Sequence, residues 1–556
     1  MSQPASPGTS GRFVQHRVTA NAEFDPAEGH PNRRAVLWVA NLSLVLVVVA
    51  VSSLNVAIPS LIRDLDPSPT ALLWIVDIYP LVFAGFLLPA GALGDRFGRR
   101  RALLFGLIVF GSGTLLASLA GGPTPLIACR AVMGLGAAFV MPSTLSVITS
   151  VFPPRERAKA IAAWAGFAGA GGALGPLLSG LMLESYTWHS VFLINAPIVL
   201  VAFAAVTVVV PESRDPDGTP LDPGGALLSM GALGLLLFGI IQGPEHGWVD
   251  PLVVGSTAAG LVVGGLFVAY EARATHPMLD PSFFRIRAFS VSAVTITSGF
   301  FAMFGMFFIL SQYFQFVLGY SPLHAGIAQL PAAVVMVILS PRSPVVVQRL
   351  GVRRTVFSGM LFIIAGLLAF AQVGPTTPYL LAMAGLVLMA TGMALTMPAT
   401  TAGLVGSLPP SKAGVGSAVN DTTREVGGAL GIAVMGSVLT SVYRSSLELP
   451  AQIPDAAAAA VNRSVGAALE VAKQAPPEFR DQLSLTARSA FADGAASAFS
   501  VAAGLMAVVA AFIWFRATDD TAAAAHFHVD PPTEGDPQQV ASTPGAANDA
   551  DGTPST

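Results

Sequence analysis

The sequence predicts an all-α integral membrane protein with fourteen transmembrane helices, arranged as two pseudo-symmetric six-helix bundles plus two extra central helices. Three observations predict this fold class: a composition suited to lipid, a series of long apolar runs, and an internal repeat. Of the 556 residues, 53% are hydrophobic and 11% are charged, whereas soluble domains carry about 25% charged residues. We therefore expect most of the chain to lie within a bilayer.

Fourteen apolar runs are long enough to cross a membrane as helices. A helix needs roughly 20 apolar residues to span about 30 Å of hydrocarbon. Charged residues are rare within these runs and lie mostly between them. The expected spans are 36–59, 70–93, 102–121, 125–148, 159–183, 188–210, 224–243, 251–270, 288–311, 323–347, 354–373, 377–405, 414–441 and 493–515.

Basic residues in the short connecting segments predict the orientation of the chain. Cytoplasmic loops retain Lys and Arg, and these residues occur in every second loop, beginning with Arg96, Arg99, Arg100 and Arg101. The opposite short loops hold only Arg63. We therefore expect a multi-pass protein of the cell membrane with both termini in the cytoplasm.

Spans and tails divide the chain into five parts. Both ends are polar, so we expect them to remain unfolded. Pro454 with Asp455 opens one helix-like stretch outside the membrane, and Pro476 with Pro477 separates it from a second. The predicted parts are a disordered cytoplasmic tail (1–34), an N-terminal six-helix bundle (35–210), a linker with two extra transmembrane helices (211–287), a C-terminal six-helix bundle (288–516) with an external helical hairpin at about 442–492, and a second disordered cytoplasmic tail (517–556).

Two distant parts of the chain repeat one pattern. MPSTLSVITSVFPPRERAKAIAAWAGFAGAGGALG (141–175) aligns without a gap to MPATTAGLVGSLPPSKAGVGSAVNDTTREVGGALG (397–431), and GDRFGRRR (94–101) matches VQRLGVRR (347–354). Parallel repeats of this kind enclose a cavity near mid-membrane depth, which opens alternately to the two sides as the halves rock. Chance similarity between helices rich in Gly and Ala is the alternative.

The composition argues against metal, redox and catalytic chemistry. Cys129 is the only cysteine, so the chain has no intramolecular disulfide and no thiol cluster. The eight histidines fall in loops, span ends and tails, without the grouping of a metal site. We expect no enzymatic activity, no metal, no cofactor and no nucleic-acid partner.

Six ionisable residues fall within the predicted spans. Each costs at least about 2.5 to 3.5 kcal/mol at the centre of a membrane helix, so such residues usually face a cavity or a partner and mark a transport path. These residues are Asp77, Arg130, Arg342, Asp421, Arg424 and Glu425.

Asp77 lies in TALLWIVDIYPLVFAGFLLPAGAL (70–93), where no basic residue is nearby in the same span. An acid in apolar surroundings can hold a proton from the exterior and release it to the cytoplasm or to an arriving cation. We expect Asp77 to act in proton and cation coupling. The alternative is a structural acid that pairs with an arginine of another span.

Asp421 and Glu425 are four residues apart, so they share one face of the thirteenth span. Their mutual repulsion disfavours joint ionisation unless Arg424 neutralises one of them. We expect coupling residues here, with an internal ion pair as the alternative. Arg130 is either a buried charge that steers a proton or a hydrogen-bond anchor, and Arg342 is expected to snorkel near the cytoplasmic end.

Aromatic side chains concentrate in the ninth span. They predict an apolar pocket in which a planar or cationic lipophile stacks, and bulk that faces lipid is the alternative. The residues of the predicted substrate pocket are Asn55, Trp74, Tyr79, Phe304 and Phe308.

GALGDRFGRRRAL (91–103) resembles the loop signature between the second and third spans of the major facilitator superfamily. The Gly, Asp, Arg and Gly of that signature fall on Gly91, Asp95, Arg96 and Gly98, and Arg100 lies in the same loop. Other segments resemble the fourteen-span drug:proton antiporters that export quaternary ammonium compounds, dyes and biocides. These segments are LNVAIP (54–59), WIVDIY (74–79), RAVMGLG (130–136), MPSTLS (141–146), GAGGALGP (169–176), WHSVFLINAP (188–197) and PESRDP (211–216).

The resemblance implies a major facilitator fold and roles for particular residues. Asp77 matches an acid implicated in proton and cation handling, and Asp421 and Glu425 fall where such exporters place acids. The antiporter motif falls on Gly171, Gly175 and Pro176. In one departure, Ala50 stands five residues before Asn55, where the first-span signature usually has Asp. This change predicts fewer coupled protons.

Residues and resemblance together predict a monomeric, proton-coupled multidrug exporter that works by alternating access in the bilayer. Its expected partners are protons and lipophilic or cationic small molecules. A dedicated exporter of one endogenous lipophile or self-made antibiotic is the alternative within transport. A non-transporting membrane receptor or a membrane enzyme is the alternative from another class.

Overall fold

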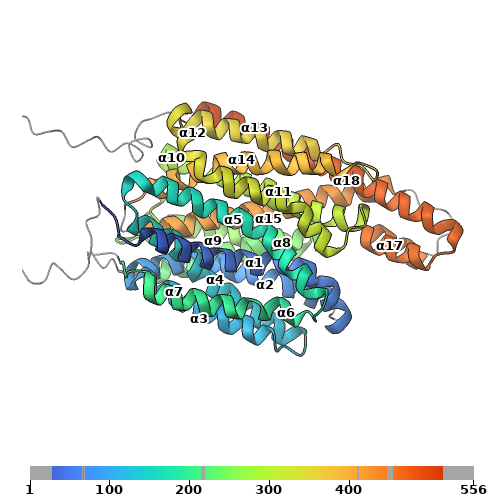
Figure 1. The fold of residues 1–556 in the computed structure, drawn as a ribbon, viewed down its shortest axis with the longest axis horizontal. Coiled ribbons are helices and arrows are strands. Elements are labelled where there is room, and N and C mark those ends of the chain that lie inside the picture. The colour runs from blue at the N-terminus through green and yellow to red at the C-terminus, as the bar shows by residue number, and fades with distance from the viewer. Residues whose placement is uncertain are drawn as a thin grey trace, which may run out of the picture.

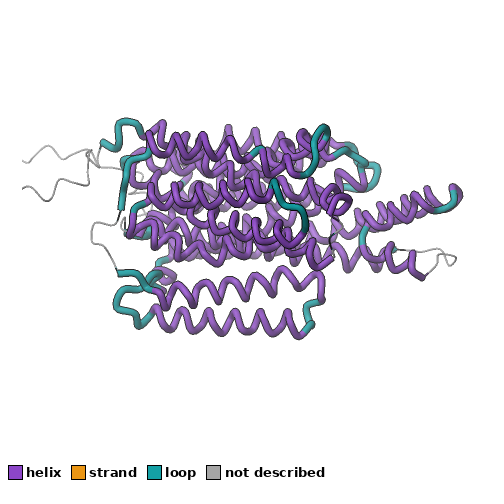
Figure 2. Tube along the Cα trace, turned by 90° about the horizontal axis from the view of Figure 1, so that it is seen from below, coloured by secondary structure: helices purple, strands orange, loops and turns teal. Residues whose placement is uncertain are grey.

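A computed structural model of the chain describes residues 28–65, 67, 69–214, 220–409, 412–447 and 455–517. The predicted tails, 1–34 and 517–556, lie almost entirely outside these residues. Within them, every regular element is a helix, and fourteen segments are long and apolar enough to cross a membrane. The predicted all-α fold with fourteen spans is confirmed. Figure 2 shows that most helices run along one common axis.

Seven helices form what we call the first half. Several helices open with proline, which is tolerated in a first turn because the N–H of that position has no partner within the helix. The predicted sixth span consists of two helices, α6 and α7, separated by Ile194. The bounds are α1 Arg33–Leu65, α2 Pro69–Phe97, α3 Arg99–Ala117, α4 Pro123–Val151, α5 Pro154–Leu183, α6 His189–Leu193 and α7 Asn195–Val209.

The second half begins after residue 280 and ends with α18. A 3₁₀ turn interrupts the predicted tenth span, because the prolines at 341 and 344 cannot donate helical hydrogen bonds. The bounds are η1 Pro281–Arg285, α10 Arg287–Gln312, the π-helical turn η2 Tyr313–Val317, α11 Pro322–Leu339, η3 Ser340–Arg342, α12 Ser343–Leu350, α13 Val352–Phe370, α14 Tyr379–Gly406, α15 Ala413–Ser446, α16 Asp455–Arg463, α17 Val465–Gln474 and α18 Pro477–Arg516.

Two further helices, α8 (Pro223–His246) and α9 (Pro251–Glu271), lie between the halves in sequence. The side chains of Asp222 and Asp250 cap them by accepting hydrogen bonds from backbone N–H groups of the first turn. Helix α8 packs against α2 and α15, whereas α9 packs against α8. The pair therefore lies alongside the place where the two halves meet.

Helix α18 contains 40 residues and is therefore about 60 Å long at 1.5 Å per residue, roughly twice the thickness of a hydrocarbon core. Figure 1 shows α17 and the outer part of α18 extending beyond the other helices. The stretch after Pro477 was expected as a separate external helix, but it continues into the last span because no proline follows it within the helix.

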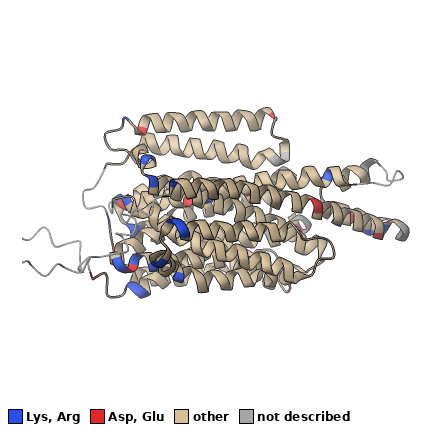
Figure 3. Cartoon of the chain, turned by 90° about the horizontal axis from the view of Figure 1, so that it is seen from above, with Lys and Arg blue, Asp and Glu red and all other residues tan. Residues whose placement is uncertain are grey.

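Most Lys and Arg residues lie at one end of the bundle, as Figure 3 shows. We call this end the basic end. It includes the end of α2 at Arg96, the start of α5 at Arg155, the start of α10 at Arg287 and Lys412 before α15. The projecting helices α16 and α17 lie at the opposite end.

Candidate transport site

The two halves meet chiefly along two pairs of helices, with smaller contacts of α4 with α15 and of α5 with α14. One contact joins α2 to α15 and the other joins α5 to α11. We call these contacts the α2–α15 seam and the α5–α11 seam. Among the acids predicted from sequence, Asp77 lies on α2, and Asp421 and Glu425 lie on α15. The predicted coupling residues therefore come from both helices of one seam.

Asp421 forms a buried ion pair with Arg424 on the same helix. Nη1 of Arg424 lies 3.3 Å from Oδ1 of Asp421, whose side chain is 1% exposed. The amide of Asn420 donates to the same oxygen at 3.2 Å, and the hydroxyl of Thr401 on α14 donates to Asn420 at 3.0 Å. Oδ2 of Asp421 has no hydrogen-bond partner among the described residues. The carboxylate is thus held at one oxygen and unsatisfied at the other.

The guanidinium of Arg424 is flanked by one aromatic ring from each half. It lies 5.1 Å from the ring centre of Trp164 on α5 and 4.5 Å from that of Phe300 on α10. Both contacts are within the range of cation–π attraction. Trp164 is itself positioned by its indole N–H, which donates to the hydroxyl of Thr144 at 3.1 Å. The ion pair of α15 therefore lies where the halves face each other.

Glu425 lies next to this ion pair and close to the first half. Its charge acts on Arg424 and Asp421, and also on Tyr79 of α2. The side chain is half-buried. Glu425 is therefore more exposed than Asp421, which is buried in the ion pair.

Arg130 of α4 is buried and binds the backbone of α2. Its Nε donates to the carbonyl of Ile75 at 3.1 Å, and its guanidinium lies 4.6 Å from the ring centre of Tyr79. These contacts are those of a hydrogen-bond anchor. Asp77 is half-buried between Ile75 and Tyr79 on α2, and its charge favours the positive charge of Arg130. The hydroxyl of Tyr79 is buried without a hydrogen-bond partner among the described groups.

The signature loop joins the halves at the basic end. Both carboxylate oxygens of Asp95 accept from the backbone N–H of Gly414, at 2.9 and 2.8 Å, and Oδ2 also accepts from Val415 at 3.2 Å. Arg99 pairs with Asp95 at 2.9 Å. A buried carboxylate at a helix N-terminus gains from the helix dipole and from charge-assisted hydrogen bonds. Asp95 therefore fastens α2 to the start of α15, and we call this contact the Asp95 lock.

Two glycines of the signature are required by geometry. Gly98 has φ of 118°, a conformation that favours glycine, and it approaches the carboxylate of Glu212 after α7. A Cβ on Gly91 would lie 2.6 Å from the carbonyl oxygen of Gly414, so α2 and α15 could not approach as closely with any larger residue. Arg100 donates to the carbonyl of Thr207 on α7.

The predicted antiporter motif on α5 faces α1 and α11. A Cβ on Gly171 would lie 3.1 Å from Val48, and the hydroxyl of Ser53 donates to the carbonyl of Gly175 at 3.1 Å. Pro176 approaches Gly326 of α11. The motif therefore lets α5 lie closely between a helix of its own half and a helix of the other half.

The predicted substrate-pocket residues lie on three helices, with Asn55 on α1, Trp74 and Tyr79 on α2, and Phe304 and Phe308 on α10. The ring centre of Trp74 lies 5.9 Å from that of Phe238 on α8. Phe304 packs against Gly428 of α15, and Phe308 is 38% exposed. The side chain of Asn55 lies outside the described residues. Phe304 lies near the ion pair, because its ring centre is 5.9 Å from that of Phe300, which contacts Arg424.

Three contributors to the ion-pair site were missed from sequence: Trp164, Asn420 and Thr401. The polar pair Asn420–Asp421 within an apolar span was a usable signal, because buried polar groups require partners. Trp164 lies in AAWAGF of the fifth span, and nothing in that segment indicates a ring that faces the other half.

Comparisons with known proteins agree with this architecture. Residues 40–432 match the family model of the Major Facilitator Superfamily. The chain is 35% identical over 494 residues to the multidrug efflux pump LfrA of Mycolicibacterium smegmatis, which covers 88% of this chain and 98% of that protein. It is 33% identical over 486 residues to the methyl viologen resistance protein SmvA of Salmonella typhimurium, with coverage of 86% and 98%.

A third relative and one solved structure complete the comparison. The tetracenomycin C resistance and export protein of Streptomyces glaucescens is 32% identical over 534 residues, which are 94% of this chain and 99% of that protein. The crystal structure of the human organic anion transporter MFSD10 matches with a TM-score of 0.59 at 16% identity, over 87% of this chain and 100% of that chain. The chain therefore belongs to the major facilitator superfamily, a family of membrane transporters rather than enzymes.

Proposed function

We propose that the protein exports lipophilic, often cationic compounds from the cell in exchange for protons, by alternating access. The observation that carries this proposal is the ion pair of Asp421 and Arg424, which lies between an aromatic ring of each half. Relatives named for multidrug efflux and for methyl viologen resistance support the substrate class. Methyl viologen is a planar dication, which suits aromatic faces and acidic side chains.

The proposed orientation places the basic end in the cytoplasm, together with both termini. In this orientation the Asp95 lock closes the cytoplasmic side, and opening it would admit substrate from the cell interior. The protein acts as a monomer in this proposal, because each chain contributes both halves of the site.

Arg424 acts in this proposal as an internal cation that substrate displaces. A lipophilic cation that enters between Trp164 and Phe300 competes with the guanidinium for the two ring faces. Glu425 is accessible to accept a proton or to attract the substrate, and Asp77 does the same from α2. A carboxylate cannot hold both a proton and a cation, so protonation from the exterior favours release of the cargo.

The driving force depends on how many protons are exchanged. One proton for one monovalent cation moves no net charge and uses only the pH difference. Each further charge adds about 2.3 kcal/mol per 100 mV of membrane potential. Because Ala50 replaces an expected acid, we propose one proton for each monovalent cation.

Reconstituted proteoliposomes with an imposed pH gradient test this function. The wild-type protein should move ethidium and methyl viologen against their gradients. Asp77→Asn and Glu425→Gln should each abolish coupling to the pH gradient, while Glu184→Gln, an exposed acid at the far end of α5, should not. Wild-type coupling in both site variants would contradict the assignment of these acids. A receptor or an enzyme would move neither protons nor dye.

One observation favours a narrower substrate range. The relative from Streptomyces glaucescens is named for resistance to and export of tetracenomycin C, a single antibiotic. If the protein exports one such compound, ethidium and methyl viologen should fail as substrates in the same proteoliposomes while a polycyclic aromatic antibiotic is transported.

A further inference from the structure

A second pair of acidic side chains lies at the basic end, apart from the ion-pair site. Asp222 precedes α8, and Glu271 is the last residue of α9. Oδ1 of Asp222 accepts from the N–H of Gly225 at 2.9 Å and from the hydroxyl of Tyr270 at 3.0 Å. Oε2 of Glu271 accepts from the N–H of Leu279 at 3.4 Å. Each carboxylate therefore uses one oxygen for local hydrogen bonds.

The other oxygen of each acid is buried without a partner among the described residues, namely Oδ2 of Asp222 and Oε1 of Glu271. Glu271 as a whole is 1% exposed. A Cβ added to Gly225 would overlap both of these oxygens, so both lie against the same α-carbon. Two unpartnered carboxylate oxygens that converge in a buried place repel each other if both acids are ionised.

A shared proton resolves this repulsion better than a metal ion does. Divalent cations such as Ca²⁺ and Mg²⁺ require about six or more oxygen ligands. The described residues contain no group of three or more His, Cys, Asp or Glu side chains that could hold a metal. A single proton needs one donor oxygen and one acceptor oxygen, and these two acids supply them.

The hydrogen bonds around the pair indicate which acid holds the proton. Asp222 caps the N-terminus of α8, where the helix dipole and the donors from Gly225 and Tyr270 favour its negative charge. Glu271 also receives backbone donors, from Leu279 and Met278, but it is more deeply buried and ends α9, where the helix dipole disfavours a negative charge. The proton therefore belongs on Oε1 of Glu271, which then donates to Oδ2 of Asp222.

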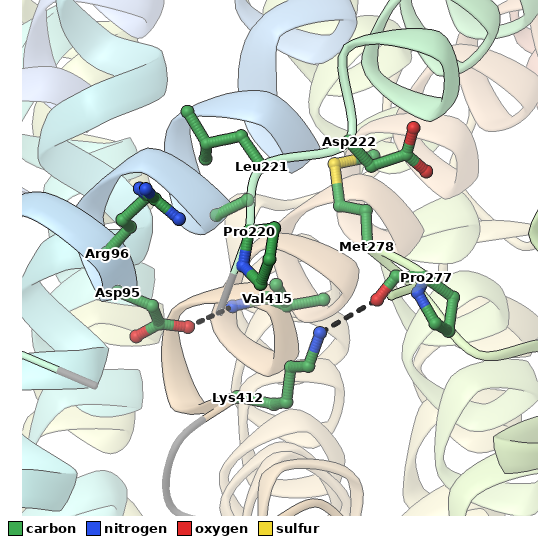
Figure 4. A pocket seen from close by; sticks show the side chains of 10 residues that line it. Asp95, Arg96, Pro220, Leu221, Asp222, Pro277, Met278, Lys412 and Val415 are labelled. Atoms are coloured by element: carbon green, nitrogen blue, oxygen red, sulfur yellow. Dashed lines mark hydrogen bonds between the residues drawn. The ribbon is translucent and has the colours of Figure 1, made fainter. Parts of the chain in front are cut away.

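Hydrogen bonds connect this pair to the Asp95 lock. Lys412, directly before α15, donates to the carbonyl of Pro277 at 2.8 Å, and residues 278 and 279 follow in the loop that binds Glu271. Figure 4 shows Lys412, Asp222, Asp95 and Arg96 around one cavity. This cavity has a volume of about 30 Å³, which is enough for about one water molecule. Asp222 lines this cavity, so the acid pair borders a space that can hold water.

We propose that Glu271 and Asp222 together bind one proton at the basic end and couple its loss to release of the Asp95 lock. The charged and titratable groups that face the pair are Tyr270, Lys412, Asp95 and Arg96. When the proton leaves, repulsion separates the start of α8 from the end of α9, which disturbs the loop at Pro277 and its contact with Lys412. The site lies outside the proposed transport path and does not depend on the identity of the cargo.

Infrared difference spectroscopy of the purified full-length protein tests this site without substrate or gradient. A step from acid to alkaline pH should remove a protonated-carboxyl band in the wild type. In Glu271→Gln and in Asp222→Asn, the difference spectrum should lack this protonated-carboxyl band. The control Glu470→Gln, an exposed acid paired with Lys473 on α17, should retain it. Wild-type difference spectra in both site variants would overturn the proposal.

Thermal unfolding against pH provides a second measurement, which works even if one variant folds poorly. A proton held more tightly in the folded state stabilises the fold at low pH, and this stability is lost as the pH rises through the folded-state pKa. Either site variant should remove this component of the pH dependence. If sodium raises the unfolding temperature of the wild type and of Glu470→Gln but not of Glu271→Gln, the site binds a cation and the proposal is wrong.

Discussion

The two seams between the halves differ in the interactions that hold them together. The α2–α15 seam contains the Asp95 lock at its basic end, and the charge of Glu425 acts on Tyr79 farther along. The α5–α11 seam is held by glycines and small side chains. A Cβ on Gly180 would lie 3.1 Å from the backbone of Leu323, and one on Gly326 would lie 3.1 Å from the backbone of Leu177. Both seams pack backbone closely, since Gly91 meets Gly414 in the α2–α15 seam, but among the described contacts only the α2–α15 seam adds a buried carboxylate.

This difference indicates which seam can open. Charge-based contacts change strength when a proton or a cation arrives, whereas a close backbone contact has no such control. The α5–α11 contacts extend from Gly180 to Ala162, whose carbonyl accepts from the hydroxyl of Ser340 at 2.6 Å. We therefore expect the halves to pivot on the α5–α11 seam while the α2–α15 seam opens and closes.

The internal repeat places corresponding loops in the two halves, and only one of these loops forms a lock. Gly98 in the first half and Gly351 in the second have φ of 118° and 81°, so both loops keep the glycine that the turn requires. The position of Asp95, however, is occupied by Gln348 in the aligned segment. Both halves retain the shape of the loop, but the described residues of the second half carry no carboxylate in this place. The lock is therefore one-sided.

The largest effect should come from Asp95→Asn. Hydrogen bonds to a charged group contribute about 1.5 to 3 kcal/mol each, and the amide of Asn would place a donor against the N–H groups of Gly414 and Val415. We expect the closed state to lose about 3 kcal/mol, or roughly 100-fold in the equilibrium between closed and open. Spin labels at Arg101 and Arg287, in a chain with Cys129 replaced by Ser, should report a longer distance.

The matched control is Asp250→Asn, which removes the charge of a capping aspartate at the opposite end of the bundle. It should leave the distance distribution unchanged. An unaltered distribution in Asp95→Asn would show that the lock does not hold the seam closed.

The next largest effect should come from Gly326→Leu in the α5–α11 seam. The added side chain meets backbone atoms of Leu177 and Pro176, which cannot rotate away, and overpacking of this kind costs about 1 to 3 kcal/mol. Both stability and transport should fall. Thermal unfolding and dye efflux measure this, with Gly255→Leu as the control because nothing lies within 4 Å of a Cβ there. If Gly326→Leu and Gly255→Leu have equal effects on the unfolding temperature and on dye efflux, the α5–α11 seam is not the pivot.

A smaller effect should follow from Trp164→Leu. This change removes one of the two ring faces from Arg424, a contact of about 0.5 to 2 kcal/mol, and leaves the ion pair with Asp421. Affinity for cationic substrates should fall several-fold, while affinity for neutral ones changes less. Fluorescence titration with ethidium measures the affinity for a cationic substrate. The control Trp248→Leu removes an indole that binds Ser437 far from Arg424. If both variants bind ethidium equally, Trp164 does not form part of the site.

The sequence predicted the spans well because apolar length alone determines them. Charges within spans were also visible, since they stand out against apolar neighbours. The sequence could not show that Trp164 and Phe300, 136 positions apart in the chain, flank one guanidinium, because this depends on how the halves dock. It also did not single out Glu271, which lies at a span end and whose unpartnered oxygen is apparent only from the position of Asp222.

The smallest effect should come from Ser340→Ala at the basic end of the α5–α11 seam. The hydroxyl of Ser340 crosses the seam to the carbonyl of Ala162, and a hydrogen bond of this kind contributes about 1 kcal/mol. Ser500→Ala on α18 is the matched control, because its hydroxyl binds a carbonyl of its own helix. If the seam is a pivot held by packing, Ser340→Ala should lower the unfolding temperature slightly and leave the rate of dye efflux unchanged. If efflux accelerates instead, this hydrogen bond must break in each cycle, and the α5–α11 seam opens as well.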